Sequence, residues 1–286
     1  MKTRVISGIV LGILTVGLGI FGQISLGAVL ALCSLIGYFE MTRALEVHRK
    51  GEKENALEIS GFFWTLVLWM FLIVFSKLYG AEAFIALGTR VSLLGIMGIF
   101  STNMTIYVLT FPKYHADQVA YSIFSFVYVP VLMSCIFRAK MLPYGIFIYA
   151  LIFFCSWICD TFAYFVGRAL GKHKMAPVLS PKKTIEGAVG GLIGSAVCSV
   201  IVAYLVKLVD PSADLRLQFL IIGIFGALIS MIGDLAASAI KRNHNIKDYG
   251  DLIPGHGGIM DRFDSIIFTA PIIYILGVFL LGTAKF

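Results

Sequence analysis

The sequence predicts an all-α polytopic integral membrane protein with about nine transmembrane helices. Of its 286 residues, 59% are hydrophobic and only 14% are charged, about half the charged share of an ordinary soluble domain. The apolar residues gather in runs of about 20, the length that an α-helix needs to cross the hydrocarbon layer of a bilayer. Glycine, proline and clusters of polar residues separate these runs.

Nine runs satisfy this length criterion. The first is interpreted as a span and not as a cleaved signal peptide, because no small-residue cleavage site follows it. The fourth run would begin near Ala81 if Arg90 lies inside it. The expected spans cover residues 4–21, 24–42, 60–78, 91–111, 118–138, 143–167, 184–206, 217–240 and 264–283.

The basic residues predict how these spans are oriented. With nine spans, 16 of the 23 Lys and Arg residues fall on one side and 7 on the other. Cytoplasmic loops collect positive charge, so we expect the N-terminus in the cytoplasm and the C-terminus outside. The net charge of +7 is then a matter of topology, and no nucleic-acid partner is predicted. Loops 168–183 and 241–263 both fall on the cytoplasmic side.

The polar chemistry concentrates in the second half of the chain. Residues 1–140 hold N-terminal and middle spans to which we assign no chemistry, and residues 141–286 form the predicted catalytic region. The stretch 234–264 alone contains five Asp, four Lys or Arg, two His and four Gly. The five cysteines all lie in apolar runs without ligand spacing, which favours packing over a zinc site.

Two aspartates lie inside predicted spans, Asp160 in the sixth and Asp234 in the eighth. A carboxylate at this depth is costly and should face a polar cavity or a cation; the alternative is a helix-end residue that reaches water. Asp261 and Asp264, three residues apart at the start of the ninth span, share one helix face. Oxygen ligands of this kind suit Mg²⁺ bound together with phosphates.

Loop 168–183 ends in a basic segment that could bind an anion. Ser180 is expected to cap the seventh helix with Pro181 at its first position. The free N–H groups there, together with Lys182, Lys183 and Thr184, would form a phosphate site. The alternative is that these basic residues only mark the cytoplasmic side.

Together these features predict a cytoplasm-facing pocket at the membrane surface that holds a divalent cation and phosphates. A metal-dependent phosphoryl or nucleotidyl reaction on a lipid fits them. An ion-coupled secondary transporter that uses Asp160 and Asp234 fits them as well.

The stretch 238–264 resembles the signature of the CDP-diacylglycerol synthases, also called phosphatidate cytidylyltransferases. Two upstream segments, 160–167 and 180–187, resemble further motifs of this family, so the resemblance covers about residues 160–265. The positions that carry the signature are Ser238, Lys241, Arg242, Lys247, Asp248, Gly250, Ile253, Pro254, His256, Gly257, Gly258, Asp261, Arg262 and Asp264.

The resemblance implies transfer of a cytidylyl group from CTP to phosphatidic acid, with Mg²⁺ (Mn²⁺ as an alternative) as cofactor. This lipid substrate further predicts that the pocket opens sideways toward the lipid, beside spans six, eight and nine. It also implies a homodimer in the bacterial inner membrane with its active site facing the cytoplasm. A related CTP-dependent lipid kinase is the first alternative, and the transporter is the second. The implied metal ligands are Asp234 and Asp261. The other candidate catalytic residues are Lys241, Asp248, His256 and Asp264. The candidate substrate- and phosphate-binding residues are Asp160, Ser180, Lys182, Lys183, Thr184, Ser238, Arg242, Lys247 and Arg262.

Overall fold

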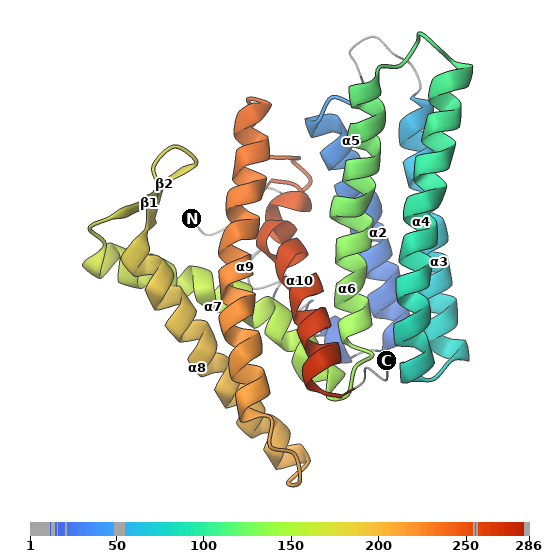
Figure 1. Cartoon of the computed structure of the whole chain (residues 1–286). Coiled ribbons are helices and arrows are strands. Elements are labelled where there is room, and N and C mark those ends of the chain that lie inside the picture. Colours follow the sequence, from blue (N-terminus) through green and yellow to red (C-terminus); the bar gives the residue numbers. More distant parts are fainter. Residues whose placement is uncertain are drawn as a thin grey trace. The chain divides into compact units, whose positions relative to one another are not determined.

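The protein is helical, with a single two-stranded sheet among the residues that the computed structural model describes (Figure 1). Those residues are 12, 15, 17–20, 22–48, 55–253, 255 and 257–282. The elements in chain order are α2 (Gln23–Ala44), α3 (Ala56–Leu78), α4 (Ala81–Leu109), α5 (Ala116–Phe126), the π-helical turn η1 (Val127–Val131), α6 (Leu132–Ala139), α7 (Gly145–Leu170), β1 (Lys174–Ala176), β2 (Ser180–Thr184), α8 (Ile185–Val209), α9 (Arg216–Asn243) and α10 (Met260–Leu280).

Within this described part, eight helices are long and apolar enough to cross a membrane. One of them, Ala116–Ala139, runs through α5, η1 and α6, and its π-helical turn contains Pro130, which has no N–H to donate. The eight correspond to the second through ninth predicted spans, which confirms the multi-pass membrane fold. α4 begins at Ala81, so Arg90 lies inside it. The predicted first span, 4–21, falls largely outside the described residues.

The chain divides into two compact units. Unit 1 contains the described residues up to Met141 together with Ile246–Arg262. Unit 2 contains Leu142–Asn245 and the described residues from Phe263 onward. The predicted domains also divide near residue 141, but the segment Ile246–Arg262 groups with unit 1 and not with the second half of the chain.

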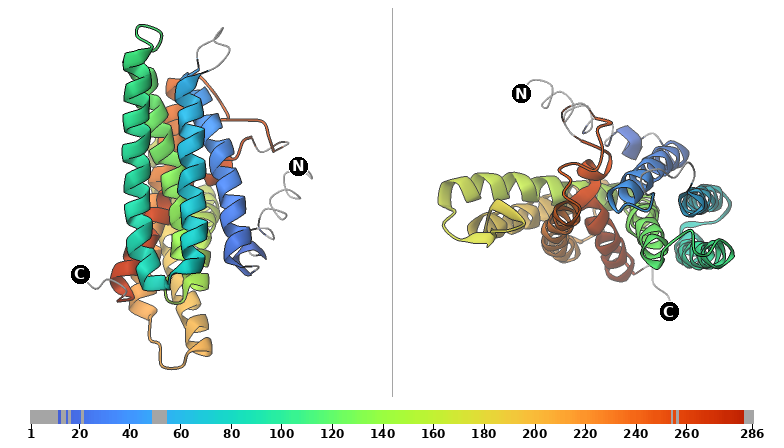
Figure 2. Two further views of the ribbon diagram at one scale, coloured as in Figure 1. Left: turned by 90° about the vertical axis from the view of Figure 1, so that its right-hand side faces the viewer. Right: turned by 90° about the horizontal axis from the view of Figure 1, so that it is seen from above.

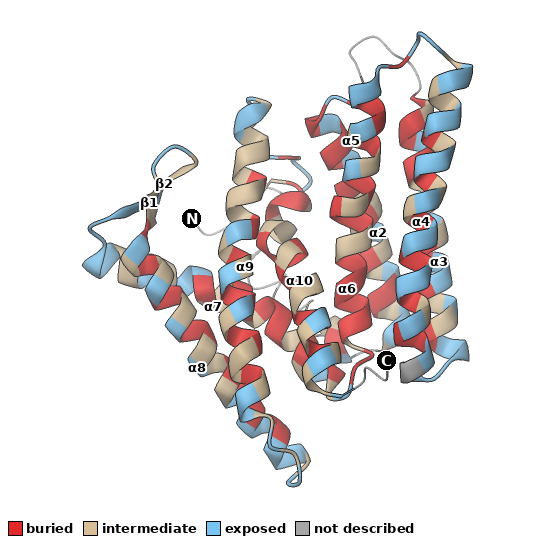
Figure 3. Cartoon of the chain, in the orientation of Figure 1, coloured by how far each residue is buried: buried red, intermediate tan, exposed pale blue. Residues whose placement is uncertain are grey.

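In unit 1, α2 to α6 run alongside one another as a bundle (Figure 2). The outer faces of α3 and α4 remain exposed (Figure 3), although they are apolar. Phe63, Leu66, Leu94 and Met97, for example, are each more than half exposed. An apolar surface of this extent is typical of helices that face lipid.

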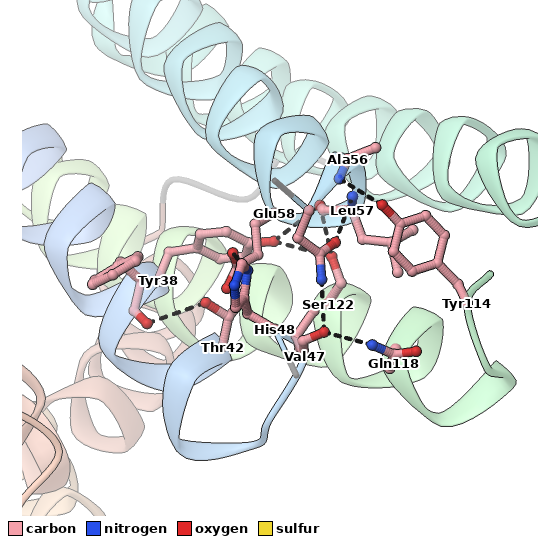
Figure 4. A network of polar contacts seen from close by, with 12 residues as sticks. Tyr38, Thr42, Val47, His48, Ala56, Leu57, Glu58, Tyr114, Gln118 and Ser122 are labelled. Atoms are coloured by element: carbon pink, nitrogen blue, oxygen red, sulfur yellow. Dashed lines mark hydrogen bonds and ion pairs between the residues drawn. The ribbon is translucent and has the colours of Figure 1, made fainter. Parts of the chain in front are cut away.

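A buried polar network fixes the end of α2 to α3 and α5 (Figure 4). The side-chain amide groups of Asn55 and Gln118 both donate to the carbonyl oxygen of Val47, at 2.7 and 2.8 Å. The hydroxyls of Tyr38 and Ser122 are 3.0 Å apart. Nearby, Glu58 lies 3.4 Å from His48. Because pairing stabilises buried polar groups, the hydrogen bonds of Asn55 and Gln118 to Val47 fix the chain that follows α2.

Unit 2 is built on close helix contacts at glycines. The small-residue spacing Gly187/Gly191 and Gly190/Gly194 predicts such packing, and the structure confirms it between α7 and α8. A β-carbon at position 191 would stand 2.7 Å from the carbonyl oxygen of Cys159. In the chain segment that connects α7 to α8, β1 and β2 pair in antiparallel fashion, with Lys174 opposite Thr184 and Ala176 opposite Ser180.

Candidate active site

Three aspartates come together in unit 2 from three different helices. Asp160 lies on α7, Asp234 on α9 and Asp264 on α10, close enough for their carboxylates to repel one another. Gly233 explains how α9 approaches α10, because a β-carbon there would stand 3.0 Å from the carbonyl oxygen of Asp264. The contact places Asp234 beside Asp264 and concentrates negative charge at one point of the unit.

Lysines offset part of this charge. Lys183, on β2, forms an ion pair with the Asp234 carboxylate, and the two side chains are only 25% and 28% exposed. Lys183 also attracts Asp160, and Lys241 attracts Asp264. The arrangement is therefore a cluster of carboxylates with lysines beside it. Its carboxylates could bind a cation, and its lysines could bind an anionic group.

The predicted cap of the helix after loop 168–183 is wrong. Ser180 and Pro181 do not begin a helix; they lie in β2, because the segment pairs with β1. Thr184 is the N-cap of α8 instead, and its hydroxyl accepts a hydrogen bond from the N–H of Gly187 at 3.1 Å. Consequently Lys182 and Lys183 are presented by a strand and not by the first turn of the helix.

The upstream motif residues hold this hairpin in place. Gly167, on α7, lies against Thr184: a β-carbon at position 167 would stand 2.8 Å from the Thr184 hydroxyl oxygen. Glu186 accepts hydrogen bonds from the backbone N–H groups of Lys172 and His173, at 3.1 and 3.3 Å. Its carboxylate also lies 2.6 Å from Nδ1 of His173. Both contacts fix the path of the chain between α7 and β1.

A cavity of about 180 Å³ opens beside these groups. It combines charged side chains with apolar ones, and none of the described α10 residues lines it, in contrast to the predicted position beside spans six, eight and nine. The hairpin and α8 take that place, because the loop before α8 folds back over α7. The lining residues are Asp160, Ala163, Tyr164, Met175, Lys182, Lys183, Thr184, Ala188 and Met231.

A second and larger cavity, of about 540 Å³, lies in unit 1. It is formed by the segment that precedes α10 and by the first turn of that helix. Its lining is mostly polar and includes both charges, with Lys247 and Arg262 as cations and Asp248 and Asp251 as carboxylates. Ligand pockets commonly have volumes of ~300–1,000 Å³, so this cavity has the size of a nucleotide site, whereas the cavity of unit 2 does not.

Asp261 organises the segment around the larger cavity. Its side chain is buried, at 6% exposure, and its Oδ2 accepts hydrogen bonds from the N–H groups of Tyr249 and Gly258, at 2.8 and 3.0 Å. Gly257 has a φ of 80°, a left-handed conformation that favours glycine. Asp261 thus fixes the glycine-rich turn, a role that the sequence analysis did not assign.

The remaining predicted residues are distributed over both units. Ser238, Lys241 and Arg242 lie in the last turns of α9. His256 lies outside the described residues. Among the residues that the structure does describe, no three His, Cys, Asp or Glu side chains are already arranged to hold a metal ion.

Sequence reasoning missed two carboxylates. Glu186 lies in the upstream segment 180–187 but received no role. Glu40, on α2, lies in the half of the chain without assigned chemistry, yet it accepts hydrogen bonds from the N–H groups of Ile259 and Met260. The available signal was its place within the predicted span 24–42, because an ionisable residue inside a span is a candidate for function.

A multi-pass membrane protein that gathers carboxylates and lysines beside two cavities is suited to anionic, phosphorylated substrates at a membrane. The chain belongs to the cytidylyltransferase family, which it matches over residues 2–280, and it is therefore a nucleotidyl-transferring enzyme. It is 32% identical over 280 residues to a phosphatidate cytidylyltransferase of Bacillus subtilis, covering 96% of this chain and 97% of that protein. Phosphatidate cytidylyltransferases of Staphylococcus saprophyticus and Staphylococcus haemolyticus are 41% and 39% identical, over 59% of this chain and 63% of each relative.

Proposed function

We propose that the enzyme transfers the cytidylyl group of CTP to phosphatidic acid, giving CDP-diacylglycerol and pyrophosphate. The observation that carries this proposal is the likeness to the Bacillus subtilis phosphatidate cytidylyltransferase along 96% of the chain. The family match also favours cytidylyl transfer over the two alternatives, a CTP-dependent lipid kinase and an ion-coupled transporter.

The reaction is an in-line displacement. An oxygen of the lipid phosphate forms a bond to the α-phosphorus of CTP, and the bond from that phosphorus to the bridging oxygen breaks, releasing pyrophosphate. The second pKa of a phosphate monoester is near 6, so at pH 7 the attacking group is already largely ionised and needs no strong general base. The main obstacle is repulsion between two polyanions, which cationic side chains can offset.

The two cavities suit the two substrates. The larger and mostly polar cavity, with Lys247 and Arg262, suits the triphosphate of CTP. The smaller cavity, where Lys182 and Lys183 stand among apolar side chains, suits the phosphate of a lipid whose tails remain in the bilayer. Lys241 and Arg242, at the end of α9, are further partners for phosphate oxygens.

Mg²⁺, with Mn²⁺ as an alternative, is the proposed cofactor. The chemistry of the acidic cluster suits such an ion, because the Asp234 carboxylate, with Asp160 and Asp264 near it, supplies hard oxygen donors. Mg²⁺ is usually held by one or two carboxylates, with water and substrate phosphates completing its shell. The resemblance implies Asp234 and Asp261 as its ligands; Asp234 belongs to this cluster in unit 2, whereas Asp261 belongs to unit 1, where it holds the glycine-rich turn. When bound, the ion supplies positive charge against which the phosphates approach and pyrophosphate leaves.

The charge count and the resemblance support proposals for the membrane orientation, the location and the oligomeric state of the enzyme. The excess of Lys and Arg on one side supports an active site that faces the cytoplasm. The inner membrane and the homodimer are carried over from the bacterial family.

A labelling assay tests the reaction. The purified protein is incubated with phosphatidic acid, Mg²⁺ and CTP labelled either in the base or in the γ-phosphate. We expect base label in the lipid, release of pyrophosphate, loss of activity with a chelator and recovery with excess Mg²⁺. Transfer of γ label with no base label would establish the kinase instead. No label in the lipid from either form would refute both.

A further inference from the structure

Glu40 is a buried carboxylate whose hydrogen-bond partners lie in a distant part of the sequence. Its side chain projects from α2 and is 5% exposed. Its two oxygens accept hydrogen bonds from the N–H groups of Ile259 and Met260, at 3.0 and 2.8 Å. These N–H groups lie at the start of α10, where backbone donors lack partners within the helix. Glu40 therefore caps α10 from more than 200 residues away, and its negative charge favours that helix end.

Two glycines of the signature are explained by the same carboxylate. A β-carbon at Gly250 would stand 2.5 Å from Oε1 of Glu40, and one at Gly258 would meet that oxygen even more closely. The cavity-lining segment passes so near to Glu40 that only a hydrogen fits at these two positions. The glycines and Glu40, although distant in sequence, are parts of one contact.

Glu40 and Asp261 together hold the segment between Tyr249 and Met260. Among the described residues, the N–H groups of Tyr249 and Gly258 donate to Asp261, and those of Ile259 and Met260 donate to Glu40. Both acids are buried and near enough to repel each other, an arrangement that costs free energy. Rigid presentation of binding groups accounts for the cost, because preorganised sites lose less entropy when a ligand binds.

We infer that Glu40 is a positioning residue for CTP: it holds the segment 249–260, and thereby the flanking residues Lys247, Asp248 and Arg262 that bind the triphosphate, without contacting the nucleotide itself. This inference rests on the proposed function for the identity of the ligand. It assigns to α2, in the half of the chain without a recognised motif, a direct part in forming the nucleotide cavity.

The test compares Glu40→Gln with Glu58→Gln as the matched control. Glu58 is also a buried carboxylate of unit 1, at 9% exposure, but it projects from α3 and lies 3.4 Å from His48. In Glu40→Gln, an amide N–H₂ replaces one accepting oxygen and faces a backbone donor. We expect the KM for CTP to rise by about 10- to 100-fold, the range for loss of a hydrogen bond to a charged group, with the KM for phosphatidic acid unchanged.

Hydrogen exchange provides a readout that does not depend on activity. We expect faster exchange in peptides covering residues 249–260 of Glu40→Gln, and wild-type exchange there in Glu58→Gln. Glu40→Asp, which keeps the charge, should restore part of the affinity for CTP and should serve as the test if the glutamine variant fails to fold. Unchanged exchange together with an unchanged KM for CTP in a folded Glu40 variant would overturn the inference. If the wild-type protein makes no CDP-lipid but the exchange result holds, the proposed function fails while the positioning role stands.

Discussion

Removal of the Lys183 ammonium group is the most direct test of the acidic cluster. Lys183 pairs with Asp234 and also attracts Asp160, so Lys183→Met leaves three neighbouring carboxylates without that cation. It also removes a cation from the cavity proposed for the lipid phosphate. Loss of one electrostatic contact of this kind commonly lowers kcat by ~10²–10³, and we expect kcat/KM for phosphatidic acid to fall by a factor in that range.

The effect on stability should be smaller. Fully exposed ion pairs contribute about 0–1 kcal/mol, and breaking a fully buried pair costs about 3–5 kcal/mol. The side chains of Lys183 and Asp234 are 25% and 28% exposed, between these limits, so a coupling free energy of about 1–3 kcal/mol is expected. A double-mutant cycle of Lys183→Met with Asp234→Asn, followed by chemical denaturation in detergent, measures it.

Lys174→Met is the matched control, because Lys174 is an exposed lysine on the neighbouring strand and does not line the cavity. It should retain wild-type kcat/KM. The reasoning is refuted if Lys183→Met is as active as this control. It is also refuted if the two substitutions in the cycle are additive to within about 0.5 kcal/mol, the level at which sites act independently.

Two further predictions concern unit 2. Gly191→Ala should destabilise the protein by about 1–3 kcal/mol through overpacking, because its methyl group would stand 2.7 Å from the Cys159 carbonyl oxygen. Thermal unfolding measures this effect, and Gly80→Ala, whose methyl group would meet nothing within 4 Å, is the control. Equal melting temperatures of the two variants would contradict the prediction. Hydrogen bonds from Ser212 and from the Tyr144 hydroxyl, at 2.6 Å, lower the pKa of Asp210. A carboxylate with a lowered pKa stabilises the fold at pH values above the ordinary aspartate pKa of ~3.9, and this stabilisation is lost as the pH falls below that value. The melting temperature of the wild type should therefore decline more steeply between pH 5 and 3 than that of Asp210→Asn. Parallel declines would argue against a contribution of Asp210 to stability.

The membrane-spanning helices could be predicted because each depends on a local property. A run of about 20 apolar residues is stable across a bilayer whatever its neighbours are. The small-residue spacing around Gly191 likewise indicated close packing, since glycines three or four positions apart lie on one helix face.

The cap of α8 could not be predicted in the same way. Ser180 followed by Pro181 is a common helix start, and the local sequence favoured it. Pairing with Lys174–Ala176 draws this segment into a strand, and such a pairing depends on a second segment of chain. The helix then begins at Ile185, four residues past Pro181.

The sequence by itself determined that this protein crosses the membrane many times, that it belongs among the cytidylyltransferases, and which charged residues carry that likeness. These properties reside in composition and in the order of residues along one segment. Only the tertiary structure decided which charges meet: Asp234 with Lys183, and Glu40 with the start of α10. Residues so far apart in sequence become neighbours through helix packing alone, and a buried carboxylate gains its role from the donors that packing brings to it.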